Sequence, residues 1–155
     1  MTQSLKSKPL RLSDYLPYRL SVLSNTISRK IAETYEAEFG ISMRQWRVMA
    51  ILGECPGLNA TDISERAAMD KVAVSRAVSS LIEMNVLRRE ATQSDGRRSC
   101  LYLTERGEAV YARIVPMAAR YEEELTAAMD GADVKKLLDL LDACASVVAP
   151  DRQLW

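Results

Sequence analysis

The chain has 155 residues, and its 21 lysine and arginine residues balance 21 aspartate and glutamate residues, so the formal net charge is zero. Hydrophobic residues make up 48% of the sequence, which is typical of a globular domain and excludes a largely disordered chain. Histidine is absent, which excludes histidine metal ligands and general bases, and the six glycines form no phosphate-binding loop motif. We therefore expect no enzyme, no cofactor and no metal site.

The first third of the chain is expected to form two helices. Apolar residues recur every three or four positions from Leu16 to Tyr35, which predicts a long helix that ends near Gly40. Ser42 is well placed to cap a second helix, which the Cys-Pro-Gly sequence at 55–57 would end.

Two short helices are expected next. Asn59, with Asp62 three residues later, is placed to begin the first of them, and Asp70 can cap the second, over 71–84. Asn85 can end this second helix in the left-handed conformation. Its predicted buried side consists of Val74, Val78, Leu81 and Ile82. Its outer side is polar and basic and consists of Lys71, Ser75, Arg76, Ser79 and Ser80.

A β-hairpin and two further helices complete the chain. Two short extended runs flank the sequence Gln-Ser-Asp-Gly at 93–96, which predicts a hairpin. Thr104 can cap a long helix, which Pro116 should kink or weaken, and residues 130–131 break it before a last helix. The apolar positions of the long helix are Val110, Ile114, Met117, Tyr121 and Leu125. Those of the last helix are Leu137, Leu138, Leu141, Cys144 and Val148.

The zero net charge conceals an uneven distribution. Residues 1–30 carry six basic groups and one acidic group, whereas residues 107–155 carry an excess of four acidic groups. The segment 71–98 has six basic residues against three acidic ones. This local excess is modest, and on charge alone a solvated surface is the favoured interpretation.

The two short helices, the tight break between them and the hairpin together predict a winged helix-turn-helix. The expected fold class is therefore mainly α with a small β-hairpin (α+β). In such a fold the second helix enters the DNA major groove, where arginine can form paired hydrogen bonds with guanine. An arginine on the hairpin would suit the narrow minor groove. An ordinary helical domain with a solvated hairpin is the alternative.

From about Leu12 to Val148 the sequence resembles the MarR family of bacterial transcription regulators. Four segments carry the resemblance: QWRV at 45–48, VSRAVSSL at 74–81, VLRR at 86–89 and DGRRSCLYLTERG at 95–107. The chain departs from the family at Asn85, where glycine is usual, and at Ala68, where a turn glycine is frequent. The resemblance implies one MarR-type domain over 1–155, with a winged helix-turn-helix DNA-binding lobe over 42–107 and dimerisation helices over 11–40 and 108–150.

The resemblance also implies which side chains contact double-stranded DNA. Ser75 and Arg76 would face the major groove, with Lys71 near a phosphate, whereas Arg97 would enter the minor groove from the wing. Asp95 would hold a wing arginine in place through a charge-assisted hydrogen bond. The full DNA-binding set is Lys71, Ser75, Arg76, Ser79, Arg97 and Arg98, the last as a phosphate contact.

For three other side chains, the sequence leaves two possible roles open. Arg88 and Arg89 either contact DNA or tie the base of the wing to the body of the protein. Trp46 either stacks on a ligand or lies in the core, and the core is favoured for a large aromatic residue.

The terminal helices have wide apolar stripes that one helix-turn-helix core cannot cover. The resemblance implies that these helices interleave in a homodimer and place two recognition helices on a palindromic operator, with half-site centres about 10 base pairs apart. A monomeric bundle is the alternative, and it would leave Trp155 exposed.

Family members often bind small aromatic or phenolic anions, so the resemblance implies an unknown small-molecule effector. Its candidate lining residues are Tyr15, Tyr18, Met43, Arg47 and Met49, for each of which packing or solvation is the favoured alternative. The three cysteines are too few and too far apart for a disulfide framework or a zinc site. Cysteine sensing is the family's other mechanism, but Cys100 and Cys144 are expected to be inert thiols.

The preferred interpretation is a homodimeric repressor that its effector releases from DNA. The chain has no apolar run long enough to span a bilayer and no secretory signal, so we expect a cytoplasmic protein without a membrane partner. The alternatives are an architectural DNA-binding protein without an effector and a protein-interaction module that has lost DNA binding.

Overall fold

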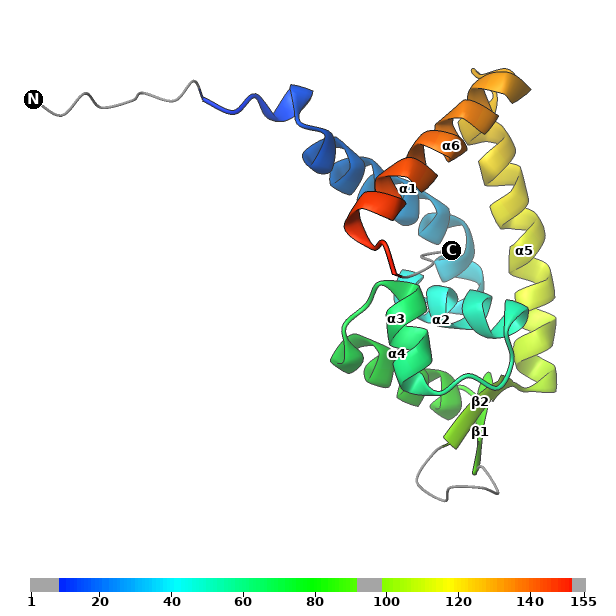
Figure 1. The fold of residues 1–155 in the computed structure, drawn as a ribbon. Coiled ribbons are helices and arrows are strands. Elements are labelled where there is room, and N and C mark those ends of the chain that lie inside the picture. The colour runs from blue at the N-terminus through cyan, green and yellow to red at the C-terminus, as the bar shows by residue number, and fades with distance from the viewer. Residues whose placement is uncertain (1–8, 92–98, 152–155) are drawn as a thin grey trace, which may run out of the picture.

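The computed structural model describes residues 9–91 and 99–151. A short 3₁₀ helix, η1 (Leu12–Asp14), precedes the first four α-helices: α1 (Leu16–Phe39), α2 (Met43–Glu54), α3 (Ala60–Ala67) and α4 (Lys71–Glu83). The hairpin strands β1 (Leu87–Ala91) and β2 (Ser99–Leu103) follow, and α5 (Glu105–Thr126) and α6 (Gly131–Val148) end the described chain (Figure 1). The predicted fold class, mainly helical with one antiparallel hairpin, is confirmed.

The helices begin where short polar side chains can satisfy their first backbone N–H groups. The Ser42 N–H donates to Gln45 Oε1 at 2.7 Å, and the Gln45 N–H donates to Ser42 Oγ at 3.4 Å, which forms a capping box at α2. Asn59 and Asp62 form a second capping box at α3. The side chains of Asp70, Thr104 and Asp130 cap α4, α5 and α6, so the predicted starting points are confirmed.

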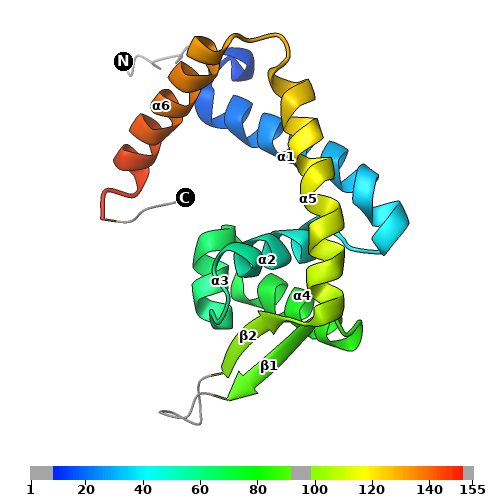
Figure 2. The same cartoon turned by 90° about the vertical axis from the view of Figure 1, so that its right-hand side faces the viewer.

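The core lies between α2, α3, α4, the hairpin and the adjacent ends of α1 and α5 (Figure 2). Trp46 packs against it, with its ring centroid 5.8 Å from that of Tyr35 and 5.7 Å from that of Tyr111. This position agrees with the core interpretation of Trp46. The largest fully buried side chains include Tyr35, Ile41, Met49, Leu52, Ile63, Leu81, Leu87, Leu101 and Ile114.

The start of α5 is locked to the turn that follows α4. Thr104 Oγ1 accepts a hydrogen bond from the Gly107 N–H at 3.0 Å and donates to the Asn85 carbonyl at 2.7 Å. A Cβ atom at Gly107 would lie 2.1 Å from the Val86 carbonyl oxygen, so only glycine allows this approach. The Leu-Thr-x-x-Gly sequence therefore joins α5 rigidly to the base of the hairpin. The helix continues through Pro116.

Helix α6 and the first half of α1 lie outside this core (Figure 2). No residue of α6 is buried, and Leu138 and Val148 are 56% and 75% exposed. The apolar stripe of α6 is therefore not buried within one protomer. The first half of α1 is also exposed at Leu16 and Leu23, whereas Leu20 between them is half-buried.

Candidate nucleic-acid interface

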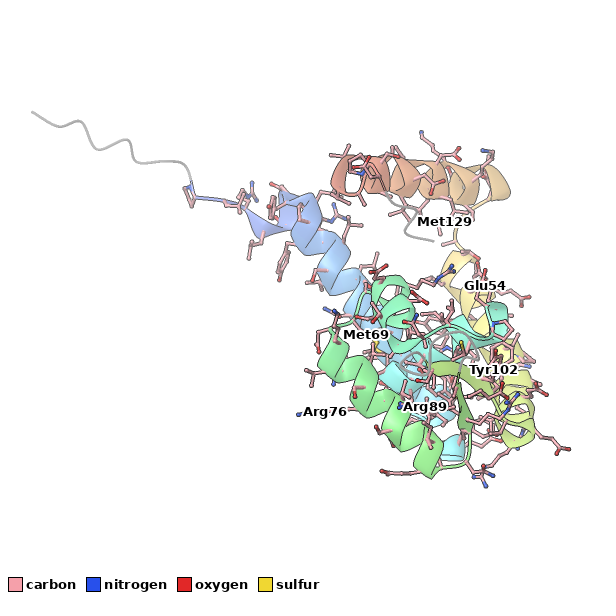
Figure 3. All side chains as sticks on the ribbon, turned by 60° about the horizontal axis from the view of Figure 1, so that its bottom comes forward. Glu54, Met69, Arg76, Arg89, Tyr102 and Met129 are labelled. Carbon is pink, nitrogen blue, oxygen red and sulfur yellow. The ribbon has the colours of Figure 1, made fainter. Side chains whose placement is uncertain are left out.

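The outer face of α4 carries the side chains predicted to contact the major groove. The opposite face of α4 is buried through Val74, Ala77, Val78 and Leu81. Because helical side chains repeat every 3.6 residues, this burial turns the other face outward. Lys71, Ser75, Arg76 and Ser79 are all exposed. Figure 3 shows Arg76 extending from α4 away from the body of the lobe.

Two positions on α4 differ from the expectation. Ser80, expected on the outer side, is half-buried and accepts a hydrogen bond from Gln45, because the first turn of α2 packs beside it. Ile82 is half-buried, and Ala77 takes the fourth place on the buried face. The small alanine was missed because its side chain adds little to an apolar pattern.

The turn between α3 and α4 fixes the direction in which α4 begins. Ala68 adopts a left-handed backbone with φ of +49°, and Ser64 Oγ donates to the Met69 carbonyl at 2.7 Å. Asp70 Oδ1 then accepts from the Ala73 N–H at 2.8 Å. These contacts hold the first turn of α4, the part of a recognition helix that contacts bases.

Gln45 connects α2 to α4 and was not singled out from the sequence. Its side chain is 8% exposed, and its Nε2 donates to Ser80 Oγ at 2.9 Å and to Met84 Sδ at 3.7 Å. The Oε1 atom accepts from the Ser42 N–H. A single amide therefore completes the cap of α2 and sets the position of α4 relative to it.

A cavity of about 390 Å³ lies between the start of α2 and the outer face of α4. Arg44 and Arg76 bring positive charge to it from the two helices, and Asp70 brings one carboxylate. Arg44 is exposed, and nothing in the local sequence distinguished it from a solvated arginine. The complete lining is Ser42, Arg44, Gln45, Asp70, Val72, Ala73, Arg76, Ala77 and Ser80.

The hairpin is anchored to the lobe at its base. The two strands pair from Leu87 with Leu103 to Ala91 with Ser99, and Leu101 is buried. The loop after α2 adds to β2, since the Gly57 N–H donates to the Leu101 carbonyl at 3.0 Å. Asp95, Arg97 and Arg98, predicted at the wing tip, lie outside the described residues.

Arg88 belongs to the base of the wing. Its guanidinium lies 4.8 Å from the centre of the Tyr102 ring and forms an ion pair with Glu90. Both partners lie in the hairpin itself, so neither contact ties the wing to the body of the protein, and both interpretations of Arg88 stay predictions. Arg89 is exposed on the neighbouring position of β1.

The candidate effector residues fall into two groups. Arg47 is half-buried, and its guanidinium donates to the Ala67 carbonyl at 3.3 Å and to Ser28 Oγ at 3.5 Å. Tyr15 and Tyr18 are exposed at the start of α1, and about 15 Å of helix axis separates Tyr18 from Ser28. One protomer therefore does not bring these tyrosines to Arg47. Met43 is half-buried against the core, and Met49 is fully buried within it.

Tyr35 lies beside this region and was not predicted as a functional residue. Its hydroxyl is buried and, within the described residues, has no hydrogen-bond partner. Burial first, and the Glu36 carboxylate second, raise the pKa of Tyr35 to about 12, against the opposing effect of the Arg47 charge. A buried hydroxyl without a partner carries a free-energy cost that a hydrogen-bonding ligand would relieve.

Two further features bear on the range of functions. Within residues 9–91 and 99–151, no helix combines the length and apolar character that crossing a bilayer requires. The same part of the chain contains no group of three or more cysteine, aspartate or glutamate side chains arranged to hold a metal ion.

Known proteins share both the sequence pattern and the fold. Residues 39–98 match the model of the MarR family. The chain is 25% identical over 97 residues to the transcriptional regulator HosA of Escherichia coli O111:H-, which covers 63% of this chain and 72% of HosA.

Among solved structures, a MarR/EmrR family transcriptional regulator from Acinetobacter sp. ADP1 is similar to this chain with a TM-score of 0.83 and 27% identity, over 90% of this chain and 98% of that one. The transcriptional repressor CouR, solved bound to a 23-mer DNA duplex, is similar with a TM-score of 0.76 and 25% identity, over 89% and 99% of the two chains. The family match spans α2, α3, α4 and β1 and ends before β2, and the solved structures extend the likeness to the terminal helices. Residues 39–98 therefore carry the MarR family pattern, and the chain is a DNA-binding transcriptional regulator of MarR type with a winged helix fold.

Proposed function

We propose that the protein is a homodimeric repressor that binds a palindromic operator and releases it when a small molecule binds. The observation that carries this proposal is the outer face of α4, where basic and hydroxyl side chains stand opposite a fully apolar buried face. A helix of this kind fits the major groove, and its arginine can form two hydrogen bonds with one guanine.

The DNA contacts divide between α4 and the wing. Ser75, Arg76 and Ser79 read the major groove, and Lys71 contacts a phosphate near the start of α4. In the wing, Arg97 enters the minor groove with Asp95 supporting it, and Arg98 contacts a phosphate. These roles follow from the family pattern, and for the α4 residues their exposure supports the assignment.

The terminal helices supply the dimer interface, over 11–40 and 108–150, and the lobe over 42–107 supplies the DNA contacts. This division is supported by the placement of exposed apolar side chains. Among the described residues, Leu10 to Leu23 and Val115 to Val148 contain every strongly exposed large apolar side chain except Val72. Apolar surface of this extent on a globular protein marks an interaction site, and a second copy of the same helices matches it.

The effector is a small aromatic or phenolic anion that binds between α1 and α2. Among the residues that the structure describes, the Tyr35 hydroxyl has no hydrogen-bond partner there, and Arg47 supplies a positive charge beside it. Met43 lies on the same helix as Arg47, whereas Tyr15 and Tyr18 would have to come from the partner protomer. A ligand that reorients Arg47 would disturb its bond to Ala67, the last residue of α3, and thereby the helix-turn-helix.

Selection of bound duplexes from a random DNA pool tests the proposal. We expect a palindrome with half-site centres about 10 base pairs apart. Retention of DNA without a sequence preference would indicate an architectural protein, and no retention at moderate salt would indicate a protein-interaction module. Once an operator is known, salicylate and benzoate are suitable first probes of release, with quenching of Trp46 fluorescence as an independent measure of binding.

Arg76→Ala gives the sharpest test of the α4 assignment. We expect loss of base preference at one position in each half-site, with affinity for the selected operator reduced by about 1–3 kcal/mol. Arg120→Ala, which removes an exposed arginine from the far half of α5, is the matched control and should leave base preference unchanged. Uniform weakening on all duplexes would instead make Arg76 a phosphate contact.

A further inference from the structure

Val72 is an exposed apolar side chain on the outer face of α4, which also carries the polar residues proposed to contact bases. It is 60% exposed, and among the described residues from Gly40 to Ile114 no other large apolar side chain is strongly exposed. Every other valine and leucine in this stretch is at least half-buried. Val72 is therefore the exception, and it lies on the outer face of α4, opposite the face that packs against the core.

The position of Val72 on α4 is the position of a base-reading residue. Val72, Arg76 and Ser79 follow one another at spacings of four and three residues, so they lie on one stripe of the helix. This stripe stands opposite the buried Val74 and Leu81. Val72 is also the second residue of α4, within the first turn, which in recognition helices contacts base edges.

The surroundings of Val72 carry a net positive charge. It lines the same cavity as Arg44 and Arg76, which bring a guanidinium from each of the two helices, and as Asp70, which brings one carboxylate. A single exposed valine is too small an apolar patch to hold a protein partner. It does match the DNA major groove, which presents polar base edges, negative phosphates and one apolar group, the C5-methyl of thymine.

We propose that Val72 contacts the C5-methyl group of a thymine in each half-site and makes operator choice depend on that methyl. The inference rests on the proposed placement of α4 in the major groove. Four residues of helix advance by about 6 Å, and one base-pair step by about 3.4 Å, so this thymine lies within about two steps of the base that Arg76 reads. The isopropyl group suits such a contact because a valine in a helix holds one strongly preferred rotamer.

The size of the effect follows from the apolar area involved. Removing one methyl group from water at each half-site corresponds to about a fourfold change in the dissociation constant. Two symmetric half-sites on one dimer would bring this to roughly fifteenfold, if the two contacts act independently. A change of this size is well within reach of a binding titration.

The test replaces thymine by deoxyuridine, which lacks only the methyl group, at each position of the operator obtained by selection. The full-length wild-type chain should lose about fourfold in affinity at one position per half-site, within two base pairs of the base whose preference depends on Arg76. Val72→Ala should bind the thymine and the deoxyuridine operators equally. Val72→Ile, the matched control, should keep the discrimination. Because Val72 is exposed, circular dichroism should report the same thermal midpoint for both variants.

The outcomes separate the inference from the proposed function. If an operator is selected but no deoxyuridine substitution changes affinity, or if Val72→Ala still discriminates, the inference is wrong and the repressor proposal stands. An operator without a thymine in the predicted window has the same consequence. If no DNA sequence is selected, the proposed function fails and the inference fails with it.

Discussion

Ala68 and Asn85 hold left-handed backbone conformations at the turns that follow α3 and α4, with φ of +49° and +54°. Glycine is the residue that adopts this region without strain, whereas a Cβ atom costs roughly 1–2 kcal/mol there. Asparagine tolerates the region because its short polar side chain can hydrogen-bond locally, but alanine has no such compensation. The departure from the family pattern at Ala68 is therefore a site of stored strain.

Ala68→Gly should raise the free energy of unfolding by about 0.5–1 kcal/mol, because relief of the Cβ strain exceeds the entropy that glycine adds to the unfolded chain. Urea denaturation measures this change as a higher midpoint with the same slope. Ala109→Gly, at an exposed position inside α5, is the control and should lower stability by about 1 kcal/mol. A lower midpoint for Ala68→Gly would show that the turn is not strained.

The buried Tyr35 hydroxyl makes stability depend on pH in the alkaline range. The pKa of Tyr35 is raised to about 12 in the folded state, from 10 in the unfolded state, chiefly by burial. The contribution of Tyr35 to the free energy of unfolding is fully present below pH 10 and is lost as the pH rises from 10 to 12. In this range the unfolded chain releases the proton of Tyr35 while the folded chain retains it.

Tyr35→Phe should flatten this alkaline decline, and near pH 7 it should leave stability unchanged or raise it, because the hydroxyl has no partner in the described structure. The measurement is the difference in the free energy of unfolding between wild type and variant, obtained by urea denaturation from pH 8 to 12. We expect this difference to reach about 2 kcal/mol at pH 12. The difference cancels the titration of the other tyrosines. A constant difference across this range would contradict the raised pKa.

At the scale of the elements, the sequence predicted helix ends better than helix partners. Ser42, Asp70 and Thr104 act through backbone groups within three residues, so their capping roles can be inferred locally. Gln45 acts through Ser80, which lies 35 positions away. Pairings of this kind depend on how α2 crosses α4, which hydrophobic periodicity does not specify. For the same reason, the sequence did not predict that Arg44 lines the cavity or that the hydroxyl of Tyr35 is buried.

Gln45→Leu tests the coupling between α2 and α4. It should lower the free energy of unfolding by about 1–2 kcal/mol, since it leaves the Ser42 N–H and the Ser80 hydroxyl without their buried partner. Because α4 then loses its link to α2, affinity for the selected operator should fall as well. Urea denaturation of Gln45→Leu, Ser80→Ala and the double variant should give a coupling energy of about 0.5–1.5 kcal/mol. Additive effects would mean that the hydrogen bond contributes nothing.

At the scale of the whole molecule, the zero net charge results from two terminal segments of opposite charge. The first thirty residues carry an excess of five positive charges, and the last forty-nine an excess of four negative charges. Few of the positive charges lie on the outer face of α4. This distribution predicts a salt-sensitive protein with few phosphate contacts per subunit. Two reading faces on one duplex would compensate for this, and that arrangement requires the dimer.

Leu138→Lys tests whether α6 belongs to a dimer interface. Leu138 is 56% exposed in one protomer, so a charge there costs the monomer little, whereas burial of that charge between two protomers would be strongly unfavourable. Analytical ultracentrifugation should find the wild type at twice the 17.3 kDa chain mass and the variant at the mass of one chain. Lys136→Ala, on the exposed surface of the same helix, should remain dimeric. The monomeric variant should keep its helical content but bind the operator at least tenfold more weakly, because each half-site then binds alone. A variant that stays dimeric would place the interface on another face of the terminal helices.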